Sequence, residues 1–114
     1  MVRKEEEEQR KLADKFHQAV VNAEVKECQE LISKGFKPSI ENFIVAVSSH
    51  RRDQNQFDLL ELLMKQPGIG VNVRDRGGHL PLEYPIEKFN PEILEWLIKK
   101  GADTTQNRLD LPLF

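Results

Sequence analysis

The same helix ending occurs twice in this sequence, and the spacing between the two copies constrains how the chain can fold. LISKG at residues 31–35 and LIKKG at residues 97–101 share the pattern apolar-apolar-x-x-Gly, and their glycines stand 66 residues apart. A related ending, LLMKQPG at residues 62–68, falls at the midpoint, so the period is about 33 residues. Repetition at this period indicates a solenoid, in which each unit buries its apolar face only against its neighbours.

Apolar residues recur at helical spacing in short runs that form three consecutive pairs. The pairs occupy residues 12–35, 40–68 and 82–101, and a glycine closes each of them. The polar segment SSHRRDQNQ separates the two runs of the second pair. Because no run alternates between apolar and polar residues for the length of a strand, the sequence predicts an all-α fold of about three helical hairpins.

The balance of charges argues against nucleic acid or an acidic membrane as the partner. The 17 Lys and Arg residues oppose 19 Asp and Glu residues, and the formal net charge of -2 gives no general attraction for phosphate groups. No apolar run approaches the roughly 18 residues of a membrane span, and the start, MVRKEEEE, lacks the apolar core of a signal peptide. We therefore expect a cytoplasmic protein, although secretion into a host cell by a specialised machine fits the same features.

No group of residues has the spacing of a catalytic, cofactor-binding or metal site. His17, His50 and His79 lie in different units, and none is paired with another ligand at metal-binding spacing. The glycines within 68–78 lack the residues that complete a phosphate-binding loop. Cys28, the single cysteine, falls on an apolar helix face and is expected to be a buried, inert thiol. The sequence predicts no enzyme, no cofactor and no bound metal.

The third pair carries the residues that point to a known kind of repeat. DRGGHLPLE at residues 75–83 and PEILEWLIKKGAD at residues 91–103 resemble an ankyrin repeat, in register, at its D-x-x-G turn, its T-P-L-H and E-I-V segments and its G-A-D end. Residues 16–35 are similar to the helical part of an earlier repeat, and residues 40–72 resemble a degenerate middle repeat. The resemblance implies an ankyrin-repeat solenoid of about three helical hairpins, with the third repeat the clearest.

The chain divides into three parts on this basis. Residues 1–11 form a charged N-terminal helix extension, and residues 12–106 form the ankyrin-repeat domain. Residues 107–114 are either a C-terminal tail or a truncated fourth repeat, since Leu-Pro-Leu at 111–113 copies Leu-Pro-Leu at 80–82. We expect this segment to pack on the third hairpin, because Leu109, Leu111, Leu113 and Phe114 left in water would favour aggregation.

Several departures from the family pattern carry structural expectations. Leu80 and Glu83 replace the Thr and His that form hydrogen bonds near the start of the first helix, so we expect that network to be lost. Pro85 replaces a small alanine and predicts a shortened or kinked helix. The middle unit lacks part of its loop, so its hairpin finger is expected to be missing.

The resemblance also implies where a partner would bind, because ankyrin proteins use their hairpin fingertips and the inner face of each first helix. Arg74, Arg76 and His79 match the finger, and Glu87 and Lys88 match the inner helix. This mostly basic strip predicts an acidic or polar-faced protein partner, whose identity the sequence does not give.

Two further features have both a structural and a binding interpretation. Arg51 and Arg52, in the polar interruption of the second pair, are either part of a solvated loop or contacts for the partner. Trp96 is either partly buried between units or an exposed anchor. We expect burial for Trp96.

The leading functional interpretation is a non-enzymatic protein–protein interaction module, an adaptor, inhibitor or effector-type binder. One alternative is a structural or self-associating domain, present as a monomer or a weak dimer. Another is docking through the C-terminal peptide RLDLPLF at residues 108–114, which resembles the motif by which bacterial proteins bind the replication sliding clamp.

Overall fold

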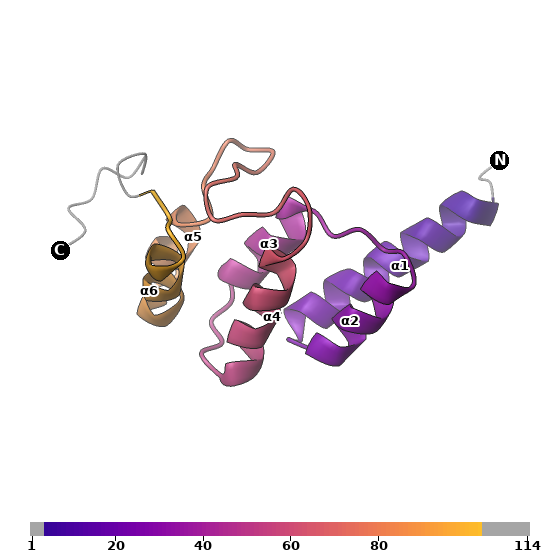
Figure 1. Cartoon of the computed structure of the whole chain (residues 1–114), viewed down its shortest axis with the longest axis horizontal. Helices are drawn as coiled ribbons and strands as arrows, with labels where there is room; N and C mark the ends of the chain where they lie inside the picture. Colours follow the sequence, from indigo (N-terminus) through magenta and orange to yellow (C-terminus); the bar gives the residue numbers. More distant parts are fainter. Residues whose placement is uncertain (1–3, 104–114) are drawn as a thin grey trace.

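The computed structural model of the protein describes residues 4–103. Within this range the chain forms helices and no strand, which confirms the expected all-α class (Figure 1). The tail at residues 107–114 and its leucines lie outside the described residues. The helices are α1 (Lys4–Val21), α2 (Val25–Ser33), α3 (Ile40–Val47), α4 (Gln54–Met64), α5 (Glu83–Glu87) and α6 (Pro91–Lys99).

The helices are arranged as three pairs that follow one another along the length of the molecule (Figure 1). α1 packs with α2, α3 with α4, and α5 with α6. Successive pairs touch through α1 and α3, through α2 and α4, and through α3 and α5. The described residues therefore contain the three helical hairpins expected from the sequence, stacked side by side.

Glycines end the second helix of the first and third pairs, as the repeated sequence pattern requires. Gly35 and Gly101 have φ angles of 105° and 100°, in the left-handed region that glycine adopts without strain. After each glycine, the next residue donates its N–H to a carbonyl five residues earlier, at 3.1 Å and 3.0 Å. The two sequence copies thus fold into the same helix cap.

Side-chain caps begin the second helix of the second pair and of the third pair. Asp53 accepts a hydrogen bond from the N–H of Gln56 at 3.1 Å, and Asn90 accepts one from the N–H of Ile93 at 3.4 Å. The Asn90 amide also donates to the Ser49 carbonyl at 2.9 Å. Asn90 therefore fixes the start of α6 and ties it to the loop after α3.

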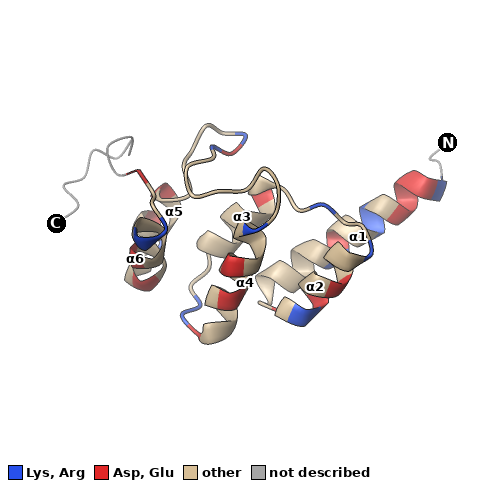
Figure 2. Cartoon of the chain, viewed as in Figure 1, with Lys and Arg blue, Asp and Glu red and all other residues tan. Residues whose placement is uncertain are grey.

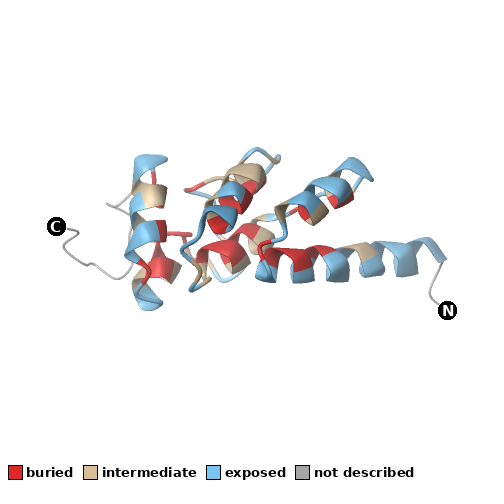
Figure 3. Ribbon diagram, turned by 90° about the horizontal axis from the view of Figure 1, so that it is seen from below, coloured by how far each residue is buried: buried red, intermediate tan, exposed pale blue. Residues whose placement is uncertain are grey.

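The hydrophobic core is continuous through all three pairs because each pair covers the next. Figure 3 shows the buried residues on the sides of the helices that face other helices. Burial of a large apolar side chain contributes roughly 1.5 to 3 kcal/mol to folding. The most deeply buried members include Phe16, Cys28, Leu31, Phe43, Val47, Leu59, Leu60, Leu63, Leu80, Leu82, Ile93 and Leu97.

The third pair departs from the first two in the length of its first helix. α5 has only five residues, and Pro85 lies buried in its middle. Proline has no N–H to donate and its ring crowds the preceding turn, so a long helix cannot form around it. The expectation of a shortened helix at Pro85 is confirmed.

The links between pairs differ strongly in length. Residues 34–39 join α2 to α3, whereas residues 65–82 join α4 to α5 and project beyond the helices (Figure 1). The longer link contains the finger, residues 74–79, and the shorter link before the second pair has no counterpart of it, as expected from the sequence.

The N-terminal part of α1 extends past the rest of the stack and carries charged side chains of both signs (Figure 2). Residues 4–10 are all exposed, and Phe16 is the first residue of the helix that is buried. Of the helices in residues 4–103, none has both the length and the apolar character that crossing a membrane would require.

Phe89 occupies an unfavourable backbone conformation that gives a testable consequence for stability. Its φ is 53°, and its side chain is 84% exposed, so the ring contributes little packing. We expect Phe89→Gly to raise the free energy of unfolding by about 1 kcal/mol, because glycine adopts this conformation without a Cβ clash. Urea unfolding would measure the change.

Ala23 provides the matched comparison because its φ is also 53° but its side chain is only 3% exposed. Ala23→Gly relieves the same backbone conformation while removing a buried methyl group, so its gain should be smaller than that of Phe89→Gly. A less stable Phe89→Gly protein would show that the Phe89 ring stabilises the fold.

Candidate functional site

The finger, residues 74–79, is a tight turn closed by its own backbone. The N–H of Asp75 donates to the His79 carbonyl, and the N–H of Gly78 donates to the Asp75 carbonyl, both at 2.9 Å. Gly78 has a φ of 81°, which a residue with a Cβ adopts only with strain. Arg74 adds a side-chain bond, since its Nη1 donates to the Gly78 carbonyl at 2.7 Å.

The Asp75 carboxylate organises the finger from inside the turn. Its Oδ1 accepts hydrogen bonds from the N–H groups of Gly77 and His79, both at 2.9 Å. Its Oδ2 accepts a hydrogen bond from the hydroxyl of Tyr84 in α5. The carboxylate therefore connects the finger to the helix that follows it.

Opposing effects act on the pKa values of this pair. Partial burial by itself raises the pKa of Asp75, but the hydrogen bonds from Tyr84, His79 and Gly77 outweigh it and hold the pKa below its usual value. Burial and the bond to Asp75 raise the pKa of Tyr84 above its usual value. The carboxylate thus stays ionised and the phenol stays a donor at neutral pH.

The cap that the family's Thr and His form is absent at the start of this helix, as expected. Glu83 makes other polar contacts there: its Oε2 accepts the N–H of Leu80 at 2.7 Å, and its Oε1 lies 3.1 Å from Nδ1 of His79. A carboxylate that accepts an N–H three residues earlier makes one half of a capping box, and here the N–H belongs to Leu80, two positions before the N-cap residue Leu82. Leu80 contributes no cap, and its side chain is buried.

The same arrangement caps α3, where Asn42 Oδ1 accepts the N–H of Ser39 at 2.9 Å. A residue three positions later therefore satisfies the N–H group before the helix in two successive pairs. The family pattern gives no sign of this bond, because Leu80 and Glu83 depart from it.

The finger is also joined to the second helical pair. Oε1 of Glu41, in α3, accepts the N–H of Arg76 at 2.9 Å and lies 4.0 Å from Nε of the same residue. The Arg76 side chain is nevertheless 93% exposed. The backbone of the fingertip is therefore fixed while the guanidinium points into solvent.

A small cavity of about 170 Å³ lies between the finger and α5, lined by His79, Glu83, Tyr84 and Glu87. The His79 ring meets the Tyr84 ring edge-on, with centroids 6.2 Å apart. His79 is therefore part of the finger's support, with 45% of its side chain exposed. The carboxylates of Glu83 and Glu87 line this cavity, so acidic groups lie beside the basic residues of the expected strip.

The remaining residues of the expected strip lie at or beyond the end of α5. Glu87, its last residue, is exposed and lines the cavity. Lys88 is exposed too, but it caps the end of the helix and is not among the residues that line the cavity. Of the expected strip, His79 and Glu87 therefore share this cavity, while Arg74 and Arg76 belong to the finger.

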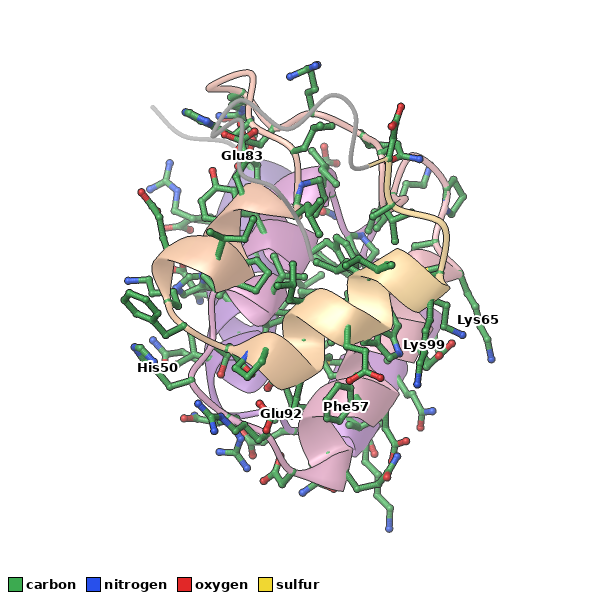
Figure 4. All side chains as sticks on the ribbon, turned by 90° about the vertical axis from the view of Figure 1, so that its left-hand side faces the viewer. His50, Phe57, Lys65, Glu83, Glu92 and Lys99 are labelled. Atoms are coloured by element: carbon green, nitrogen blue, oxygen red, sulfur yellow. The ribbon has the colours of Figure 1, made fainter. Side chains whose placement is uncertain are left out.

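Arg51 and Arg52 belong to a different region. In Figure 4, Glu83 lies at one end of the third pair, and His50 and Glu92 lie toward the other end. Arg52 Nε lies 3.3 Å from a Glu92 carboxylate oxygen, and its Nη2 donates to the Phe89 carbonyl at 3.2 Å. This arginine holds the loop after α3 against the turn between α5 and α6, away from the finger.

Arg51 takes part in the same loop. Its Nη2 lies 2.7 Å from Oδ2 of Asp53, the cap of α4, and this hydrogen bond lowers the pKa of Asp53 below its usual value. These contacts give Arg51 a structural role within the polar loop.

The expectation for Trp96 is confirmed. Its Nε1 donates to Glu61 in α4 at 3.3 Å, and its ring centroid lies 6.4 Å from that of Phe43. Trp96 therefore joins α6 to the second pair and is partly buried between units.

Cys28 and the histidines are not gathered into a reactive group. Cys28 is fully buried, and burial, with the charges of Glu24 and Glu27, raises the pKa of its thiol to about 12. His17 lies in α1, and His50 in the loop after α3. Within residues 4–103, no cluster of three or more His, Cys, Asp or Glu side chains could hold a metal ion.

Three consecutive helical pairs with a projecting finger define a protein built from repeated helical units. No protein-family model matches the sequence. The chain is 33% identical over 72 residues to a protein of Acanthamoeba polyphaga mimivirus that is named as an ankyrin repeat protein. The match covers 61% of this chain and 10% of that protein, so the chain spans about a tenth of the length of this curated relative.

The hydrogen bond between Tyr84 and Asp75 should contribute measurably to stability. We expect Tyr84→Phe to lower the free energy of unfolding by about 1 to 2 kcal/mol, because it leaves a partly buried carboxylate with one fewer donor. Urea unfolding would measure the loss. In an Asp75→Asn background the same substitution should cost clearly less, and equal losses in the two backgrounds would show that the bond contributes nothing.

The lowered pKa of Asp75 predicts a dependence of stability on pH. The unfolded state binds the Asp75 proton more readily than the folded state, so the contribution is complete above about pH 4 and is lost as pH falls through the lower folded pKa. Asp75→Asn should therefore flatten the fall in melting temperature below pH 4. Asp14→Asn, which changes an exposed carboxylate on α1, is the control and should keep the slope.

Proposed function

We propose that this chain is a non-enzymatic ankyrin-repeat module that binds another protein through its finger and the adjoining face of α5. The observation that carries the proposal is the fixed fingertip. Asp75 and Glu41 hold its backbone in place, while the Arg76 side chain is 93% exposed. The similarity over 72 residues to an ankyrin repeat protein supports it further.

Preorganisation explains why such a finger suits protein binding. A loop that is already ordered loses less conformational entropy when it meets a partner, and arginine is among the residues that contribute most at protein interfaces. Here the hydrogen bonds to Asp75, Glu83 and Glu41 already order the loop in the free protein. The exposed side chains can then make contacts without rearranging the loop.

The charges around the finger indicate the chemistry of the partner surface. Arg76 offers a guanidinium that suits a carboxylate, while Glu87 and the small cavity beside it offer acceptors for hydrogen-bond donors. A polar partner surface that carries both an acidic group and donor groups fits this arrangement better than a uniformly acidic one.

The proposal assigns no catalytic role to this chain, and the surroundings of Cys28 and Glu83 support that choice. The Cys28 thiol is buried with a raised pKa, so little reactive thiolate is present at neutral pH. The side chain of Glu83 is held by the Leu80 N–H and by His79. Glu83 and His79 thus support the fold of the finger.

Affinity capture with charge-reversed variants tests the proposed surface. The full chain and the double variant Arg74→Glu, Arg76→Glu would be used as baits against the same lysate, with bound proteins identified by mass spectrometry. We expect the variant to lose a specific partner by about tenfold or more, because a charge reversal at a contact replaces attraction by repulsion.

The matched control is Lys11→Glu with Lys15→Glu, which makes the same charge change at exposed positions of α1. Melting curves of both double variants should remain cooperative and close to that of the unchanged chain. Retention of every partner by the finger variant would show that the finger is not the binding surface.

A further inference from the structure

A groove of about 250 Å³ lies between α4 and α6. In Figure 4, Phe57, Glu92 and Lys99 lie together where these two helices meet. The finger adjoins α5 instead, and none of residues 74–79 lines this groove. The lining consists of one residue of α4 and four residues of α6: Phe57, Glu92, Glu95, Trp96 and Lys99.

The sequence of α6 explains why its four lining residues share one side of the helix. They stand at positions i, i+3, i+4 and i+7, which form a single stripe on a helix with 3.6 residues per turn. The stripe faces α4, because Nε1 of Trp96 donates to Oε1 of Glu61 at 3.3 Å and Nζ of Lys100 lies 2.6 Å from the same oxygen. These bonds join the two helices beside the groove and order its walls in the free protein.

The charged residues of the lining already form ion pairs, but these pairs are close to water. Nζ of Lys99 lies 3.1 Å from Oε1 of Glu95, and both side chains are largely exposed. Nε of Arg52 lies 3.3 Å from Oε2 of Glu92, and both side chains are about half exposed. Exposed ion pairs contribute little to stability because water and salt screen them. A ligand can therefore take the place of Lys99 beside Glu95 at small cost.

The chain itself shows that a cation is accepted beside this tryptophan. Nζ of Lys100 lies 5.6 Å from the centre of the Trp96 ring while it binds the Glu61 carboxylate. The face of an aromatic ring attracts a cation, and a carboxylate nearby adds to the attraction. The groove offers the same combination, because two aromatic rings and two carboxylates line one space.

The preceding repeat separates what is common to the repeats from what is particular to this groove. Its helix α4 carries the same charges 34 positions earlier than α6, at Asp58, Glu61 and Lys65. Leu62, however, stands where α6 has Trp96. The charges thus belong to the repeat pattern, and the aromatic wall distinguishes this groove from its counterpart.

We propose that the groove between α4 and α6 binds an arginine side chain of a partner protein. The aliphatic part of that side chain lies against Phe57 and Trp96, and its guanidinium takes the place of Lys99 at Glu95. Arginine suits the site because its planar guanidinium stacks on aromatic rings and offers a carboxylate two parallel N–H groups.

The size of the groove fits this occupant. Sites for whole small molecules have volumes of roughly 300 to 1,000 Å³. A groove of about 250 Å³ is below that range and accommodates one long side chain. The inference does not rest on the proposed function of the finger, because the two surfaces share no residue.

The single tryptophan of the chain provides a direct test, because Trp96 fluorescence reports on this groove alone. The full chain would be titrated at constant ionic strength with the blocked peptide acetyl-Gly-Arg-Gly-amide. The control ligand is the same peptide with citrulline, the neutral analogue of arginine. We expect saturable binding of the arginine peptide with a Kd on the order of millimolar, because one side chain buries little surface. The citrulline peptide should bind about tenfold more weakly. The indole N–H signal in NMR spectra provides a second readout of the same titration.

Two variants should change the affinity in opposite directions. Glu95→Gln should weaken binding of the arginine peptide by about fivefold or more, because it removes the charge that the guanidinium meets. Lys99→Met should strengthen binding by about threefold, because it frees Glu95 from its exposed ion pair. Glu30→Gln is the matched control, since it removes an exposed carboxylate of α2, and it should leave the affinity unchanged.

Several results would overturn the proposal. Absence of a saturable change in both the fluorescence and the indole signal would show that the groove takes no arginine side chain. Equal affinities for the arginine and citrulline peptides would show that it does not recognise the charge. Equal weakening by Glu30→Gln and Glu95→Gln would indicate a general attraction to the acidic surface. Weaker binding to Lys99→Met would show that Lys99 does not compete for Glu95.

Discussion

Burial of apolar side chains between successive helical pairs holds this molecule together, because no single pair contains enough apolar surface for a core of its own. Phe16, Phe43, Leu59 and Ile93 come from different helices of all three pairs, and each is completely buried. Each pair is therefore stable only while its neighbours cover it. Everything else in the structure, including the finger, is attached to this stack.

The finger depends on the stack through polar contacts. Asp75 connects it to Tyr84 in α5, Glu83 connects it to the start of the same helix, and Glu41 connects it to α3. Because α3 and α5 belong to neighbouring pairs, the position of the fingertip follows the packing between those pairs. A change in the core between them would thus alter the surface that we propose binds a partner.

Much of this fold could be predicted from the sequence because its signals are local or periodic. The glycine endings, the helical spacing of apolar residues and Pro85 gave the three hairpins, the caps at Gly35 and Gly101 and the short α5. The finger's supports could not be predicted in the same way. Glu41 lies 35 positions from Arg76, and no pattern in the sequence marks that pair.

The candidate surface was harder to predict than the fold, because a residue's exposure depends on contacts that its sequence neighbours do not reveal. Arg52 follows Arg51 in an obviously polar segment, yet it bonds to residues of the third pair and serves the fold. His79 lies in the finger as expected, but it supports Glu83 from the side.

This separation between supporting and exposed residues has a consequence for how such a surface can change. Asp75, Glu83 and Tyr84 hold the finger through hydrogen bonds that are partly shielded from water, so substitutions there alter stability. Arg76 and Glu87 project from the same scaffold with little packing of their own, so substitutions there should change the surface that we propose binds a partner at small cost to the fold. The exposed surface of the finger can therefore change while the stack beneath it stays the same.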